Sequence, residues 1–170
     1  GAIVSRDGLI LTNAHVVAPE ALGQGVVRDD ASFELPANPD HVDIAVSKGG
    51  DDEPAELTYE GRVIAADGYL DLAVVQITRT TSGKVLQPGD LDLPALELGD
   101  SKAVRLGAPL TILGFPGIAN SGAVTLTTGA VGGFQVDGRL QDNRASINTG
   151  AAIAAGSSGG VAADEAGRLI

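Results

Sequence analysis

The chain has no cysteine, methionine or tryptophan among its 170 residues, and aromatic residues make up only 3% of it. Without cysteine, disulfide bonds, zinc–thiolate sites and thiol nucleophiles are excluded, although this absence does not indicate a redox compartment. No apolar run reaches the roughly 18 residues that a membrane-spanning helix needs. We therefore expect no membrane-spanning segment in this chain.

Basic residues are also scarce, because 11 Lys and Arg stand against 22 Asp and Glu, which gives a net charge of -11. Nucleic acids and anionic membranes carry charge of the same sign, so neither is expected as a partner. Carboxylates are frequent in residues 28–40 and 50–54, but their spacing lacks the alternating ligands of a helix–loop–helix calcium site. Solvated loops are favoured there, and we predict no metal site and no cofactor.

What the chain does have is a series of short apolar runs separated by turn residues, with 44% hydrophobic residues and 24 Gly. Such spacing is typical of an all-β barrel or sandwich, and no helical periodicity is long enough to compete. Asp7-Gly8 suits a tight hairpin turn. The runs are "AIVS", "LILTNA", "HVDIAVS", "GRVIAA", "DLAVVQI", "PLTILGF", "AVTLTTGAV" and "GVAADEAGRLI".

Three polar residues stand where chemistry could occur. His15 directly follows the strand-like stretch 8–14, Asp71 opens the apolar run 71–77, and Ser158 lies among glycines in 154–160. A histidine can act as a base, a carboxylate can orient it, and a glycine-rich turn can supply oxyanion donors to a serine nucleophile. Each residue also has a structural interpretation: a satisfied strand-end histidine, a turn-capping aspartate and a flexible Gly/Ser loop.

The motifs "TNAHVV", "DLAVVQI" and "GSSGG", in the order His, Asp, Ser, together resemble the trypsin/chymotrypsin-fold serine proteases, most of all the bacterial HtrA/Deg branch. The resemblance implies two antiparallel six-stranded β-barrels. Residues 1–95 would form the first barrel, which carries His and Asp, and 96–170 the second, which carries Ser. Both ends of the chain read as strands, so we expect truncated ends and an incomplete second barrel.

The resemblance also assigns roles to residues of this chain. His15 would be the general base, Asp71 would orient it, and Ser158 would be the nucleophile in the cleft between the barrels. The backbone amides of Gly156 and Ser158 would form the oxyanion hole. The floor of the specificity pocket would contain no acidic residue, which favours small or aliphatic substrate side chains on the acyl side; it would consist of Ala152, Ile153 and Ala154.

The function predicted on this basis is that of a serine endopeptidase acting on polypeptides through an acyl-enzyme. The alternative is a catalytically silent domain of the same fold that binds peptides. The other histidine, His41, is expected to have no catalytic part, and 115–123 matches the family's activation loop. The resemblance further implies an extracytoplasmic location, periplasmic or secreted, with homo-oligomers and an appended PDZ domain as possible features of the family.

Overall fold

The computed structural model describes residues 1–23, 37–50, 53–87, 89–115, 122–138 and 144–170. Its contacts divide the chain into two compact units. The first contains Gly1–Lys48 and Ala55–Ala95, and the second contains Gly49–Pro54 and Leu96–Ile170. Within the described ranges, no helix is long and apolar enough to cross a bilayer.

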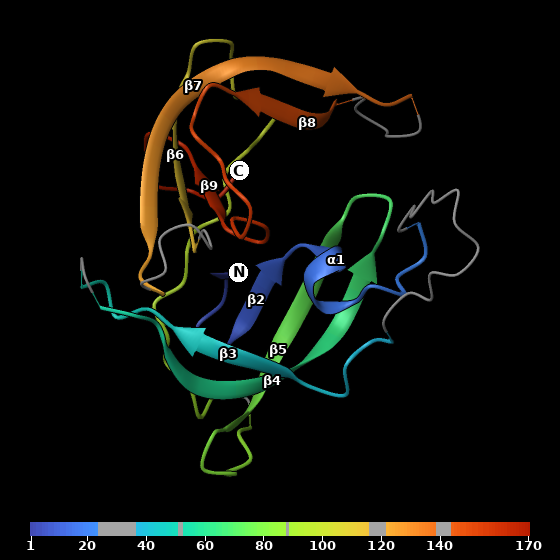
Figure 1. The fold of residues 1–170 in the computed structure, drawn as a ribbon, viewed down its shortest axis with the longest axis vertical. Helices are drawn as coiled ribbons and strands as arrows, with labels where there is room; N and C mark the ends of the chain where they lie inside the picture. Colours follow the sequence, from blue (N-terminus) through green and yellow to red (C-terminus); the bar gives the residue numbers. More distant parts are fainter. Residues whose placement is uncertain (24–36, 51–52, 88, 116–121, 139–143) are drawn as a thin grey trace. The chain divides into compact units, whose positions relative to one another are not determined.

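The first unit is an antiparallel sheet of five strands in the order β1-β2-β5-β4-β3 (Figure 1). Register shifts at Glu60/Gly61 and Val63/Ala65 interrupt the pairing of β4 with β5, and such bulges bend a strand and increase its twist, as the curved β4 of Figure 1 shows. The strands are β1 (Ala2–Ile3), β2 (Leu9–Thr12), β3 (Val42–Val46), β4 (Glu56–Asp67) and β5 (Leu72–Thr80).

The concave sheet of the first unit encloses a core of aliphatic side chains. The β1–β2 hairpin closes at Asp7-Gly8 as expected, with Gly8 at a φ of 86° that favours glycine. One short helix, α1 (Ala14–Val17), follows β2 and buries Ala14 and Val17. The buried residues of this core are Ile10, Ala14, Val17, Ala18, Ile44, Ala73, Val75 and Ile77.

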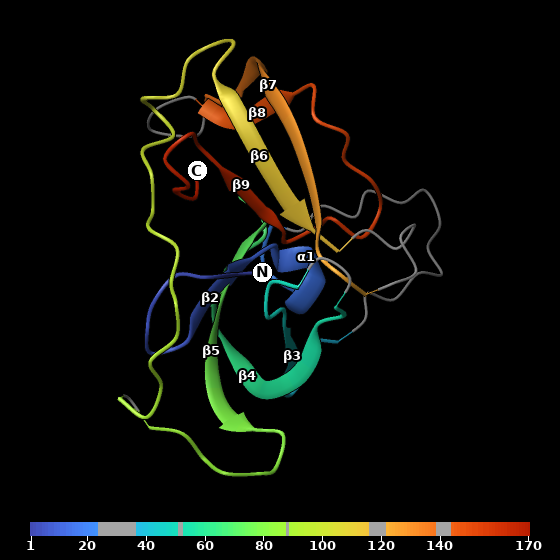
Figure 2. The same cartoon turned by 90° about the vertical axis from the view of Figure 1, so that its left-hand side faces the viewer.

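The second unit contains a four-stranded antiparallel sheet in the order β8-β7-β6-β9 (Figure 2). Its buried cluster is smaller and consists of Val104, Leu110 and Val131. At the edge strand, the Arg144 guanidinium lies 3.6 Å from the centre of the Phe134 ring. The strands are β6 (Pro109–Gly114), β7 (Thr125–Val136), β8 (Arg144–Thr149) and β9 (Val161–Ala163).

The prediction of an all-β fold with two antiparallel sheets is confirmed, while the strands are fewer than six in each sheet. The described residues contain five in one sheet and four in the other. In the last predicted run, 160–170, the sequence Glu165-Ala166-Gly167 suggests a turn. The structure has the three-residue β9 followed by a turn closed by Gly167 N–H donating to Asp164 O (2.9 Å). Strand β8 was not predicted, since "RASINT" has little apolar alternation.

The predicted run "LILTNA" also differs from the structure at its end. Strand β2 stops at Thr12, and the helix α1 begins at Ala14. Asn13 sits between them in the N-cap position with an extended backbone (φ -77°, ψ 142°). His15 is therefore placed on a helical turn that directly follows a strand.

Candidate active site

The His15 imidazole and the Asp71 carboxylate are in direct contact in the first unit. A bond of 2.7 Å joins His15 Nδ1 to Asp71 Oδ2. The backbone N–H of His15 donates to the second carboxylate oxygen, Asp71 Oδ1, at 2.9 Å. The histidine thus occupies both oxygens of the same carboxylate, once with its ring and once with its main chain.

Strand register explains why two residues 56 positions apart meet. In the β2–β5 ladder Thr12 lies opposite Ala73. Residues just after β2 and just before β5 must therefore emerge at the same end of the sheet, because the two strands are antiparallel. The turn at residues 13–15 then brings the His15 side chain to the Asp71 carboxylate.

The backbone of Asp71 is unusual in that its φ is 52°, in the left-handed region that L-residues rarely adopt. This conformation costs about 1–2 kcal/mol for most residues, and Asp is among those that tolerate it best. Two donors hold the carbonyl of Asp71: Asn13 Nδ2 at 2.8 Å and the Ala14 N–H at 3.1 Å. Sequence reasoning identified Asp71 but missed Asn13, which stands two residues before His15.

The contacts of Asp71 determine which ring nitrogen of His15 carries a proton. An ionised carboxylate only accepts hydrogen bonds, so His15 Nδ1 must be the donor. In the neutral imidazole the other nitrogen, Nε2, is then an acceptor. A carboxylate that fixes the tautomer in this way leaves Nε2 able to take a proton, which is what a general base requires.

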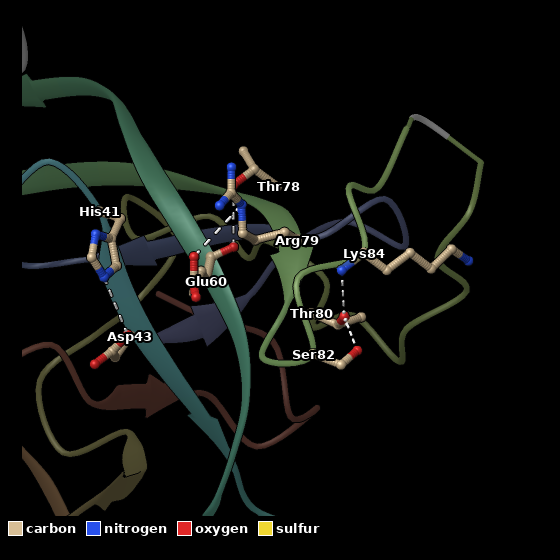
Figure 3. A network of polar contacts seen from close by, with 8 residues as sticks. All are labelled: His41, Asp43, Glu60, Thr78, Arg79, Thr80, Ser82 and Lys84. Atoms are coloured by element: carbon tan, nitrogen blue, oxygen red, sulfur yellow. Dashed lines mark hydrogen bonds and ion pairs between the residues drawn. The ribbon is translucent and has the colours of Figure 1, made fainter.

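The second histidine, His41, precedes strand β3 and is placed differently (Figure 3). Its Nε2 lies 3.7 Å from Asp43 Oδ1, and both side chains are mostly exposed. Figure 3 also shows a cross-strand ion pair, in which Arg79 Nε lies 3.6 Å from Glu60 Oε2. Ion pairs at a protein surface contribute little to the free energy of folding, about 0–1 kcal/mol. In the described part of the chain, the charged group next to His41 is therefore Asp43 and not Asp71.

The predicted nucleophile, Ser158, is an exposed residue of a loop in the second unit. Two successive turns shape this loop, with Ser157 N–H donating to Ala154 O at 3.1 Å and Gly160 N–H to Ser157 O at 2.9 Å. Gly156 has a φ of 95°, as expected for the third position of a type II turn. The amides of Gly156 and Ser158 donate to no backbone carbonyl in the part of the chain that the structure describes.

A pocket of about 130 Å³ lies next to this loop, within the second unit. The three residues predicted for a specificity pocket, Ala152, Ile153 and Ala154, all line it. Thr127 Oγ1 donates to Ala152 O at 3.0 Å and so ties this wall to strand β7. The remaining lining residues are Ile112, Gly114, Thr125, Thr127 and Ser157.

Five of these lining residues were not predicted for the pocket, and four of them lie on strands β6 and β7, whose pairing relates them. Ile112 pairs with Thr127 and Gly114 with Thr125 in the β6–β7 ladder. Residues two apart on a strand face the same side, so these two pairs share one face of the sheet. The register between β6 and β7, which the sequence did not provide, was needed to find them.

Two sequence predictions concern residues that the structure describes only in part. Of the segment matched to the activation loop, 115–123, residues 116–121 lie outside the described residues. The acidic stretches 28–40 and 50–54 are likewise described only at residues 37–40 and at 50, 53 and 54. Within the described ranges, no group of three or more His, Cys, Asp or Glu side chains could hold a metal ion.

A histidine oriented by a carboxylate on one β-sheet unit, together with a glycine-rich serine loop on another, defines the class of the trypsin-fold peptidases. Comparison with known families agrees with this, because the family model "Trypsin-like peptidase domain" matches residues 1–170. The chain therefore belongs to the trypsin-like peptidase domain family.

Within that family the chain is similar to HtrA-type proteases. It is 33% identical to serine protease HTRA2, mitochondrial, of Bos taurus over 174 residues, covering 100% of this chain and 30% of the relative. It is 32% identical to serine protease HTRA1 of Xenopus laevis, covering 100% of this chain and 29% of the relative. The solved structure of the HtrA-type protease AlgW with a decapeptide matches with a TM-score of 0.64 and 26% identity, over 99% of this chain and 40% of that one.

The chain spans less than a third of the length of the two HTRA relatives, 30% and 29%. The similarity to AlgW shows that the two sheets follow the trypsin-like protease fold, as the sequence predicted. Because the bovine relative is named as mitochondrial, the relatives do not single out a periplasmic or secreted location.

Proposed function

We propose that this chain is the catalytic domain of an HtrA-type serine endopeptidase, with His15, Asp71 and Ser158 as its triad. The observation that carries the proposal is the 2.7 Å bond between His15 Nδ1 and Asp71 Oδ2. An aspartate that only caps a turn would need no more than main-chain N–H donors, whereas Asp71 Oδ2 also binds the ring of His15. The serine loop of the second unit supplies the matching nucleophile.

In this mechanism His15 Nε2 takes the proton of the Ser158 hydroxyl as its oxygen attacks the carbonyl carbon of the scissile peptide bond. The tetrahedral oxyanion is stabilised by the amides of Gly156 and Ser158, and each such donor contributes about 3 kcal/mol to the transition state. The protonated His15 then gives its proton to the leaving amine. Water hydrolyses the resulting ester of Ser158 by the same steps in reverse order, which restores the free serine.

The pocket of the second unit supports a preference for small or aliphatic side chains on the acyl side of the cut bond. Its lining residues include no ionisable side chain, so a buried lysine or arginine side chain would leave its charge unpaired at a high cost. The volume of about 130 Å³ suits an aliphatic side chain. Valine, alanine or leucine at this position should therefore be preferred over lysine.

The proposal is tested with the full-length protein that carries this chain, a fluorogenic peptide library and a fluorophosphonate probe that labels activated serines. We expect cleavage after aliphatic residues and labelling at Ser158. Both should be lost in Ser158→Ala and in His15→Ala. Binding of peptides without cleavage or labelling would instead support the catalytically silent module, which is the alternative.

Other properties of the intact protein follow only from the resemblance and the relatives. Polypeptides are the proposed substrates, and homo-oligomers and a PDZ domain stay predictions. The extracytoplasmic location also stays a prediction. Size-exclusion chromatography of the full-length protein and its cell fractionation test these points independently of activity.

A further inference from the structure

Asn13 makes a contact that its place in the chain does not require. It occupies the N-cap position of α1, where an asparagine side chain usually accepts a hydrogen bond from the first turn of the helix. Its side chain makes no such cap. Instead, Asn13 Nδ2 donates to the main-chain carbonyl of Asp71 at 2.8 Å.

The helix is capped from the other direction. The first two helical N–H groups, of Ala14 and His15, donate to Asp71 O at 3.1 Å and to Asp71 Oδ1 at 2.9 Å. Asp71 therefore caps the helix in place of Asn13, and the Asn13 side chain in turn binds the carbonyl of Asp71. This exchange places three consecutive residues, 13–15, around one aspartate.

The orientation of the Asp71 carboxylate depends on these hydrogen bonds from residues 13–15, because the side chain is not buried and packing does not hold it. The side chain of Asp71 is 38% exposed and that of His15 is 47% exposed, so water can compete for the carboxylate oxygens. The direction in which the carboxylate points is set by the backbone, whose φ of 52° is rarely adopted by a residue other than glycine. A donor that holds the Asp71 carbonyl also holds this backbone conformation.

From this geometry we infer that Asn13 is a positioning residue of the active site. It holds Asp71 in the left-handed conformation that directs its carboxylate at His15 Nδ1, and it touches neither substrate nor reacting atoms. The effect of Asn13 on kcat that this inference predicts rests on the proposed function. Its structural part, the alignment of the His15–Asp71 bond, can be tested without any peptidase activity.

The kinetic test compares Asn13→Ala and the nearly isosteric Asn13→Leu with the native side chain in the full-length protein. Small misplacements of catalytic groups cost up to about 100-fold, so we expect kcat to fall by about 10- to 100-fold. KM should stay within about twofold, because the interaction lost is one made for the transition state. The control is Gln76→Ala, which removes an amide that donates to another main-chain carbonyl of the same unit, Asp7 O, at 2.8 Å.

A double-mutant cycle separates positioning from general destabilisation. If Asn13 acts through Asp71, Asn13→Ala should cause less than about a twofold further loss of kcat/KM in the Asp71→Asn background. An undiminished 10- to 100-fold loss in that background would overturn the inference. So would kcat values of both Asn13 variants that match the Gln76→Ala control.

The second readout is the proton NMR signal of the His15 Nδ1–H, which a short bond to a carboxylate shifts strongly downfield. We expect this signal in the native protein and in Gln76→Ala, and its loss or upfield movement in Asn13→Leu, with far-UV circular dichroism confirming that each variant is folded. A native protein that shows the signal but cleaves no peptide would contradict the proposed function and leave this inference standing. An unchanged signal in a folded Asn13→Leu would contradict the inference alone.

Discussion

The two halves of the candidate active site are held by different kinds of contact. Around His15 and Asp71, side chains make the bonds: a ring nitrogen, a carboxylate and the Asn13 amide all take part. Around Ser158, main-chain bonds close the two turns of the loop, at Ser157 and at Gly160. One half is fixed by specific side-chain chemistry and the other by backbone conformation.

This difference indicates how each half can fail. The half that contains His15 and Asp71, the base half, depends on charge-assisted bonds, which are short and directional. Changing one side chain there removes a defined contact. The half that contains Ser158, the nucleophile half, depends on the positive φ of Gly156, which glycine adopts readily, so that adding a side chain there changes the direction of a peptide group.

The largest effect is expected from the two histidines. His15→Ala should lower kcat by about a million-fold, since removing a triad base costs about as much as removing the whole triad. His41→Ala should change kcat by no more than a few-fold, because its contact is with the exposed Asp43. Steady-state kinetics with one fluorogenic peptide measure both, and comparable losses would mean that His15 is the wrong base.

The next effect concerns the backbone of the nucleophile half. Gly156→Ala forces a side chain onto a residue with a φ of 95°, and the turn should relax and misdirect the Gly156 amide. Losing one oxyanion donor should lower kcat by about 100- to 1,000-fold. Gly107→Ala is the control, because it has a similar φ of 79° in the same unit and nothing within 4 Å of its added Cβ. Equal losses of kcat in both variants would contradict the prediction.

A smaller effect should distinguish the two cores. Val75 and Val131 are both 2% exposed, but Val75 belongs to the larger cluster. Val75→Ala should lower the free energy of unfolding by about 2 kcal/mol, from two lost methyl groups and a residual cavity. Val131→Ala should cost less, because a small cluster can collapse around the gap. Urea denaturation measures both, and a larger loss for Val131 would reverse the comparison.

The smallest effect is expected at the hairpin that follows β9. A side-chain hydrogen bond from Arg168, at 2.9 Å, holds the pKa of Asp164 below its usual value of 3.8. A lowered carboxyl pKa stabilises the fold above pH 3.8, and this contribution is lost as the pH falls through the lowered pKa. Asp164→Asn should therefore lower Tm slightly at pH 7, and the Tm difference should shrink as the pH falls through the lowered pKa of Asp164. Thermal scans at pH 7 and at a series of lower pH values check this, and a Tm difference that does not change with pH would exclude the carboxylate as its cause.

The sequence was informative where chemistry is local in the chain. The strands around His15 and Asp71 have apolar runs that end at a polar residue, and the turn at Asp7-Gly8 has its own signature. The all-β fold followed from these runs. Residues 144–149 lacked such a pattern, and their strand β8 exists because β7 offers them a partner.

The sequence could not provide what depends on register. The pocket-lining pairs of β6 and β7, such as Ile112 with Thr127, are defined by which residues face each other across the ladder. The contact of Asn13 with Asp71 joins residues 58 positions apart. A sequence motif at residue 13 would suggest a helix cap, and only the fold shows that the side chain is used elsewhere.

The β2–β5 ladder that brings His15 to Asp71 also sets the earliest point in synthesis at which His15 can be oriented. His15 leaves the ribosome 56 residues before Asp71, and Ser158 follows later still. Closing such a long loop is slow compared with forming a local turn. A growing chain therefore has no oriented His15 until β5 has been synthesised, and the proposed triad stays incomplete until Ser158 has followed.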